Sequence, residues 1–83
     1  MRREEFRFGG RNLEVVALET DGVWTVTVRE DGHTVGRMEY RTTNETVSAA
    51  AHASNRVDLV QEMMRIARRD VEEDNVGLNP PPS

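Results

Sequence analysis

The chain contains no cysteine, and this absence excludes several kinds of chemistry at once. Without thiols it has no disulfides, no cysteine nucleophile and no thiolate ligands for a metal. The absence also fits a reducing compartment, and we expect the protein to be cytoplasmic. Lysine is missing too, so all eleven basic residues are arginine. Arginine suits planar, bidentate contacts with carboxylate or phosphate, but coding bias in a GC-rich genome is the simpler explanation.

Long apolar segments are also absent. No run approaches the roughly 20 residues that a membrane span needs, and the first residues lead into no apolar core of a signal peptide. We therefore expect no contact with a membrane. The 83 residues, 36% hydrophobic and 31% charged, allow one small domain with a single thin core. Such a core has no room for a large cofactor, and we expect none.

The charge of the chain is negative overall but unevenly distributed. Fifteen acidic residues outnumber eleven basic ones, for a net charge of −4. Because proteins that bind the phosphate backbone usually carry a basic excess, this balance disfavours nucleic acid as a partner. Residues 1–11 and 49–69 nevertheless carry +2 each, whereas residues 70–83 carry −4. A negatively charged partner would have to contact one of the two basic segments.

Two-residue glycine turns divide the first half of the chain into four segments. The dipeptides Gly9-Gly10, Asp21-Gly22 and Asp31-Gly32 favour the left-handed backbone of tight hairpin turns. Between them, apolar and polar residues alternate, as in strands with one buried face. The sequence therefore predicts a four-stranded antiparallel meander with strands at Glu4–Phe8, Asn12–Glu19, Val23–Glu30 and His33–Arg41.

The second half of the chain is predicted to be helical. Apolar residues recur at intervals of three and four within Val57–Val71, as expected of a helix that covers a sheet. We expect this helix to begin at Ser54 or Asn55 and to hold Asp58 in its first turn. Asn75 and Gly77 are expected to end it. The alanine-rich stretch before it is predicted to be a loop or a short separate helix, since one continuous helix would exceed the sheet in length.

These elements define an α+β domain: a four-stranded antiparallel β-meander packed on one C-terminal amphipathic helix (ββββα). We expect the domain to occupy residues 1–75. Residues 76–83 contain Pro80-Pro81-Pro82 and are predicted to be a disordered tail.

The end of the predicted helix carries four acidic residues, Asp70, Glu72, Glu73 and Asp74. Acidic groups at this end oppose the helix dipole. Arg2 and Arg3 would offset them if the first strand ran past the end of the helix, either within a chain or across a dimer. The alternatives are a solvated, fraying terminus, which needs no compensating group, and an acidic patch that recognises a basic partner.

Candidates for catalysis and metal binding are few. The chain has two histidines, His33 after the third turn and His52 close to Ser48, Ser54 and Asp58. A Ser-His-Asp arrangement can be drawn from the second group, but no Gly-x-Ser-x-Gly nucleophile motif accompanies it. The acidic residues and histidines lack the spacing of zinc and calcium ligands, and no phosphate-binding loop is present. We therefore expect no catalytic site, no metal site and no enzymatic activity.

Part of the predicted sheet resembles small DNA-binding domains of the integrase arm-binding and AP2-like folds. The resemblance lies in Trp24-x-Val26-x-Val28-Arg29-x-Asp31-Gly32 and Arg37-x-x-Tyr40-Arg41-Thr42. In those families, a three-stranded sheet backed by a helix places its outward face in the major groove. The resemblance implies that Arg29, Arg37 and Arg41 contact phosphate or guanine. Glutamates on the same strands would weaken the positive field.

Apolar residues on the predicted polar face of the sheet favour protein contacts instead. Val16, Leu18 and Val23 interrupt that face, and an apolar patch on a thin sheet commonly pairs with a second copy or another protein. The sequence therefore predicts a small, non-enzymatic intracellular protein-interaction module, with these three residues at its interface and a protein partner or self-association as a homodimer. The alternative is a nucleic-acid-binding domain that uses the three arginines named above on the outer sheet face.

Overall fold

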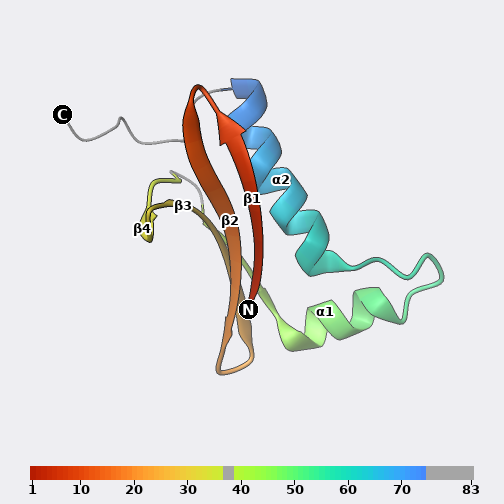
Figure 1. Cartoon of the computed structure of the whole chain (residues 1–83). Helices are drawn as coiled ribbons and strands as arrows, with labels where there is room; N and C mark the ends of the chain where they lie inside the picture. The colour runs from red at the N-terminus through yellow and green to blue at the C-terminus, as the bar shows by residue number, and fades with distance from the viewer. Residues whose placement is uncertain (37–38, 75–83) are drawn as a thin grey trace.

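The computed structural model describes residues 1–36 and 39–74, whose arrangement Figure 1 shows. The elements follow in the order β1 (Arg2–Phe8), β2 (Arg11–Thr20), β3 (Val23–Glu30), β4 (His33–Thr34), β5 (Tyr40–Thr43), α1 (Asn44–Ala51) and α2 (Leu59–Asp74). The strands form one antiparallel sheet in meander order, and α2 packs across one face of it. The predicted α+β class and the meander packed on a C-terminal helix are therefore confirmed. No helix in the described residues is long and apolar enough to cross a membrane.

The Asp-Gly turns adopt the backbone that the sequence predicts. Asp21 and Asp31 each have a φ of 50°, and the glycine after each has a φ of 80°. Both central residues of each turn thus lie in the left-handed region, which matches the right-handed twist of the flanking strands. The first of these turns places Thr20 opposite Val23 and so sets the register of β2 and β3.

The predicted fourth strand, His33–Arg41, is divided into β4 and β5. Arg29 faces Thr34, and Val26 faces Tyr40. Between these two pairs, β3 advances by three residues and the facing segment by six, so the facing segment carries three extra residues. An insertion of this kind bends a strand and interrupts its pairing, which explains why five strands replace the predicted four.

The core lies between α2 and the face of the sheet that it covers, here called the inner face. Its members are buried and come from alternate strand positions and from helix positions three or four apart, as the pattern predicts. They are Phe6, Leu13, Val15, Ala17, Val26, Val28, Val60, Met63, Met64, Ala67 and Val71. Trp24 and Tyr40 pack against the border of this core.

The main helix begins later than the sequence predicts. α2 starts at Leu59, and the Oδ1 atom of Asp58 accepts a hydrogen bond from the Gln61 amide at 3.2 Å. Asp58 is therefore the N-cap and not a first-turn residue. Arg56 has a φ of +47°, which a right-handed helix does not accommodate, so the helix cannot begin at Ser54 or Asn55. The predicted helix end at Asn75 lies outside the described residues.

The alanine-rich segment forms α1, a short separate helix with no buried residue. The hydroxyl of Thr43 caps it by accepting a hydrogen bond from the Thr46 amide at 3.2 Å. Figure 1 shows α1 beside the lower end of the sheet, apart from most of α2. Its first residue, Asn44, is bonded to the sheet through the Trp24 indole, which donates to its side chain at 2.8 Å.

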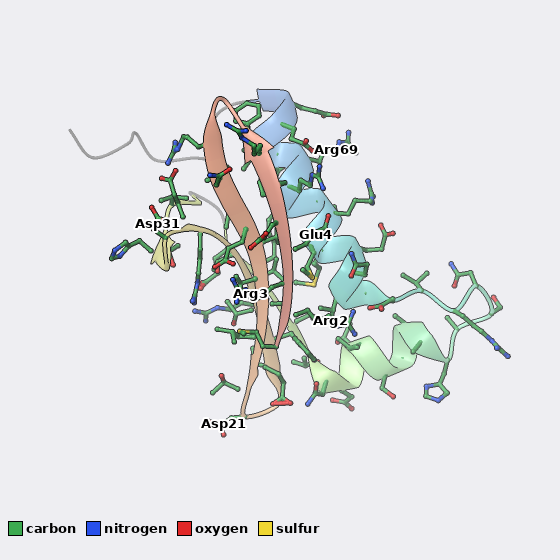
Figure 2. All side chains as sticks on the ribbon, in the orientation of Figure 1. Arg2, Arg3, Glu4, Asp21, Asp31 and Arg69 are labelled. Atoms are coloured by element: carbon green, nitrogen blue, oxygen red, sulfur yellow. The ribbon has the colours of Figure 1, made fainter. Side chains whose placement is uncertain are left out.

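β1 runs alongside α2 in the same direction, so Arg2 lies near the start of the helix and not near its acidic end. Arg2 pairs with Asp58 at 2.9 Å, and Arg3 pairs with Glu14 at 2.6 Å. Figure 2 shows Arg2 and Glu4 on the side of β1 that faces α2. Arg2 and Arg3 therefore do not offset the acidic helix end within one chain.

Three of the four acidic groups at the helix end have local partners instead. Arg68 pairs with Glu72 and Arg69 with Glu73 along α2, and the Tyr40 hydroxyl of β5 donates to Asp70. The two ion pairs offset part of the opposition to the helix dipole.

Candidate functional site

One face of the sheet has no helix of the described chain packed on it, and we call it the outer face. Strand pairing places a set of mainly polar side chains there. It includes Arg3, Glu5, Arg7, Asn12, Glu14, Val16, Leu18, Val23, Thr25, Thr27, Arg29, Arg41 and Thr43. Four of these residues are arginine and two are glutamate, so the strand residues of this face are net positive although the chain is acidic.

A hollow of about 560 Å³ opens on the outer face. We call it the outer hollow. It lies where the first three strands approach the β3–β4 turn, and Figure 2 shows Asp31 of that turn on the side of the sheet away from α2. Both signs of charge are present among its lining residues, which include Arg3, Glu5, Arg7, Glu14, Arg29 and Asp31. The outer hollow therefore suits a partner that itself carries both donors and acceptors.

Arg29 differs from the other charged residues of the outer hollow. Its Nε atom is buried and has no hydrogen-bond partner, although buried donors are normally paired. Glu14 lies opposite Arg29 across β2 and β3, but its carboxylate accepts from the Nε and Nη2 atoms of Arg3, at 2.9 and 2.6 Å. Arg29 thus carries a guanidinium donor that is left unsatisfied.

The three apolar residues predicted to form an interface share the outer face but differ in exposure. Val16 is 2% exposed, because Arg3 and Thr27 flank it on the neighbouring strands. Leu18 is half-buried, and Val23 is 37% exposed. The apolar surface that a partner can reach is therefore the corner formed by Leu18 and Val23 near the β2–β3 turn, and Val16 contributes little to it.

The arginines predicted to contact nucleic acid do not form one cluster. Arg37 lies outside the described residues. Arg29 and Arg41 both belong to the outer face, but Arg41 faces Thr25, four residues from Arg29 along β3. At about 3.3 Å per residue, this separates them by roughly 13 Å. Arg41 is exposed and pairs with Glu39 at 3.0 Å.

The grouping of Arg29 with Arg3 and Arg7 in the outer hollow was not predicted. Strand alternation already places Arg3 and Arg7 on the face opposite Phe6. The turn at Gly9-Gly10 then fixes which residues of β2 face them. Those two signals predict the shared face, but the hollow itself depends on the curvature of the whole sheet.

The histidines take part in local contacts. His52 ends α1, with its Nδ1 atom 2.7 Å from the carbonyl oxygen of Ser48. Asp58, the acidic member of the Ser-His-Asp arrangement considered above, is bonded to Arg2 and Gln61. His33 is exposed on β4. Within residues 1–36 and 39–74, no three His, Cys, Asp or Glu side chains lie close enough to hold a metal ion.

An ion pair on the inner side of the sheet holds the ends of β2 and β3 together. Arg11 donates from Nε and Nη2 to the two carboxylate oxygens of Glu30, at 3.1 and 2.8 Å. These bonds lower the pKa of Glu30 and raise the pKa of Arg11. The bidentate geometry identifies this pair as a structural contact between the two strands.

Comparison of the chain with protein-family models, with curated proteins and with solved structures found no match. What the outer face can bind therefore follows from its own residues. Arg29, whose buried Nε atom has no hydrogen-bond partner, lines a charged hollow there, and a small apolar corner is accessible farther along β2.

Proposed function

We propose that the chain is a non-enzymatic protein-interaction module whose outer sheet face binds an acidic segment of a protein partner. The observation that supports this proposal is Arg29, which lines the outer hollow and whose buried Nε atom has no hydrogen-bond partner. Guanidinium groups bind carboxylates through charge-assisted, often bidentate hydrogen bonds. A carboxylate in the hollow reaches this donor after a change of the Arg29 rotamer, a common adjustment at interfaces.

The mixture of charges favours a protein over a nucleic acid as the partner. Glu5, Glu14 and Asp31 line the same hollow as the arginines. A phosphate backbone, with a negative charge at every step, would be repelled by these carboxylates. A protein segment can place its own basic or amide groups beside them and its acidic groups beside Arg29. The apolar corner at Leu18 and Val23 adds surface that only an apolar group would fill.

A titration followed by NMR tests the proposal. On addition of a peptide that combines glutamates with lysine or glutamine, we expect the signal of the Arg29 side-chain N–H and the backbone amides of the outer hollow to shift. Arg29→Gln is expected to weaken the peptide about tenfold, through the loss of a charge-assisted hydrogen bond. Arg56→Gln is the matched control, because Arg56 is exposed in the turn between the helices. Equal weakening by both substitutions would show that only net charge matters and would contradict the proposal.

Nucleic-acid binding through the same face is the second candidate function, favoured by the four arginines among its strand residues. Arg41 distinguishes the two functions, because it lies outside the outer hollow. Binding of mixed-sequence DNA that weakens steeply with salt and is reduced by Arg41→Ala would favour this second function. Peptide binding that Arg41→Ala leaves unchanged, without measurable DNA binding, would favour the first.

A further inference from the structure

β1 is an edge strand with one unpaired side. It pairs with β2 over its seven residues, and no strand of the described chain pairs with its other side. The free N–H and C=O groups of such an edge are a template for another strand. Charged side chains protect an edge when like charges meet, because directly opposed like charges are destabilising. β1 carries both signs, in the order Arg2, Arg3, Glu4, Glu5, Phe6, Arg7 and Phe8.

We propose that two copies of the chain associate by antiparallel pairing of β1 with β1, around a twofold axis at Glu4. Directly opposite residues of an antiparallel pair lie on the same face of the sheet, so a symmetric pairing must be centred on a single residue. With Glu4 at the centre, Arg3 of each copy lies opposite Glu5 of the other. Two pairs of opposite charge therefore form on the outer face.

Arg3 and Glu5 both have hydrogen-bonding atoms that are free to form the contact between copies. Glu5 is exposed and has no hydrogen bond or ion pair within the described chain. Arg3 uses its Nε and Nη2 atoms to bind Glu14, which leaves Nη1 for the second copy. The inferred pairing thus adds to the contacts within each chain and replaces none of them.

Registers centred on Arg3 or on Glu5 are less favourable on the outer face, whereas a register centred on Phe6 places Glu5 opposite Arg7 and is distinguished by the cross-linking test below. Centred on Arg3, the pairing brings the two Arg3 side chains together. Centred on Glu5, it brings the two Glu5 side chains together and places Arg3 opposite Arg7. Each of these registers opposes like charges directly on the exposed face, at a cost comparable with the gain from an opposite pair.

On the inner face, the pairing centred on Glu4 opposes the two Glu4 carboxylates. Each of them already accepts hydrogen bonds from Arg68 at 2.8 Å and from Gln61 at 3.4 Å, which reduces their repulsion. The same register places Arg2 opposite Phe6 of the second copy. Phe6 is a core residue with only 6% of its surface exposed, and Arg2 is already bonded to Asp58, so this pair contributes little to the contact.

A cysteine substitution tests the register, since the chain has no cysteine of its own. Glu4→Cys would place two thiols opposite each other at the axis. The Cα atoms of directly opposite residues lie about 4.5–5.5 Å apart, within the range of about 4.4–6.8 Å that a disulfide spans. Arg7→Cys is the control, because in this register the two copies of position 7 lie about 20 Å apart. We expect mild oxidation to give a covalent dimer of the first variant only.

Failure of Glu4→Cys to form this dimer, or equal cross-linking of both variants, would overturn the proposal.

A charge swap gives a second test, read by sedimentation equilibrium. Arg3→Glu alone or Glu5→Arg alone is expected to raise the dimer dissociation constant at least about tenfold, because two attractive pairs become repulsive. The double variant restores attraction and should return to within about threefold of the original. It also keeps a partner for Glu14, which lies opposite position 5 on β1. A double variant as weak as either single one would contradict the pairing.

This inference rests on other observations than the proposed acidic partner, although Arg3 and Glu5 also line the outer hollow. Arg29→Gln removes the donor in the outer hollow but lies away from the β1 edge, so the dimer dissociation constant should not change. Loss of peptide binding without loss of the dimer, or the reverse, shows which of the two inferences fails.

Discussion

At the scale of single residues, Tyr40 shows how one hydroxyl connects the sheet to the helix. It lies on β5, packs against the core and donates a hydrogen bond to the Asp70 carboxylate on α2. This hydrogen bond, together with partial burial and the charge of Asp70, raises the pKa of Tyr40 to about 12. The same bond gives a partner to an acidic group near the unfavourable end of the helix.

Tyr40 is predicted to make the stability of the protein sensitive to alkaline pH. Its pKa is higher in the folded state than the value of about 10 in an unfolded chain, so its contribution is complete below pH about 10 and is lost as the pH rises toward 12. Because the chain has one tyrosine, the ultraviolet absorbance of tyrosinate reports the titration directly. A midpoint near 10 in the folded protein would contradict the contact.

Tyr40→Phe is the matching substitution. We expect it to lower the free energy of unfolding by about 1 kcal/mol at neutral pH, the usual contribution of one hydrogen bond. Between pH about 10 and 12, the variant should lose much less of its free energy of unfolding than the original protein does. Chemical unfolding followed by circular dichroism measures both effects.

At the scale of elements, the start of α2 depends on Asp58. Its carboxylate accepts hydrogen bonds from the Gln61 amide and from Arg2 of β1. The Gln61 amide is the main reason that the pKa of Asp58 is lowered, and Arg2 lowers it further. One side chain thus ends the turn, begins the helix and ties the first strand to it.

Asp58→Ala is predicted to lower the free energy of unfolding by about 1 kcal/mol at neutral pH, as expected for an N-cap. Because the folded-state pKa of Asp58 is depressed, its contribution is present above the unfolded value of about 4 and is lost as the pH falls through the folded value. The difference between the two proteins should therefore narrow in acid. Asp58→Asn keeps a capping oxygen and should lower the free energy of unfolding less than Asp58→Ala does. A difference that is the same at neutral and acidic pH would argue against this role.

The interrupted fourth strand depends on a glycine. A Cβ atom at Gly36 would lie 3.1 Å from the Cβ atom and 3.2 Å from the backbone nitrogen of Val28. We therefore expect Gly36→Ala to destabilise the protein by roughly 1–3 kcal/mol, as overpacking does. Thr34→Ala, at an exposed position of β4, should change stability by less than about 0.5 kcal/mol. Equal thermal unfolding midpoints for the two variants would contradict the close packing at Gly36.

At the scale of the whole molecule, locally determined features were predictable from the sequence. The Asp-Gly turns and the alternation around Val26 identify the hairpins and their buried face. Features that depend on distant contacts were not. The left-handed backbone of Arg56 moves the helix start, and the direction of β1 along α2 brings Arg2 to Asp58. The exposure of Val16 likewise depends on neighbours that only the strand register reveals.

We predict that α1 unfolds locally while the sheet and α2 stay folded. Because α1 has no buried residue, its amides should exchange hydrogen through local opening, well before those of β2 and β3. Ala49→Gly should speed exchange in α1 and leave global stability within about 0.5 kcal/mol. Val60→Ala, at a fully buried position of α2, should lower global stability by about 2 kcal/mol. Simultaneous exchange of α1 and the sheet would show a single cooperative unit instead.

The surroundings of Trp24 have a practical consequence. Its indole N–H is bonded to Asn44 at the start of α1, and the Arg2 guanidinium lies 5.7 Å from the centroid of its ring. Three segments distant in the sequence therefore meet at the only tryptophan of the chain. If α1 separates from the sheet while the sheet stays folded, the Trp24 ring becomes exposed to water. Its fluorescence emission then shifts to longer wavelength at temperatures below the main unfolding transition. The protein therefore carries its own fluorescent reporter of this local event.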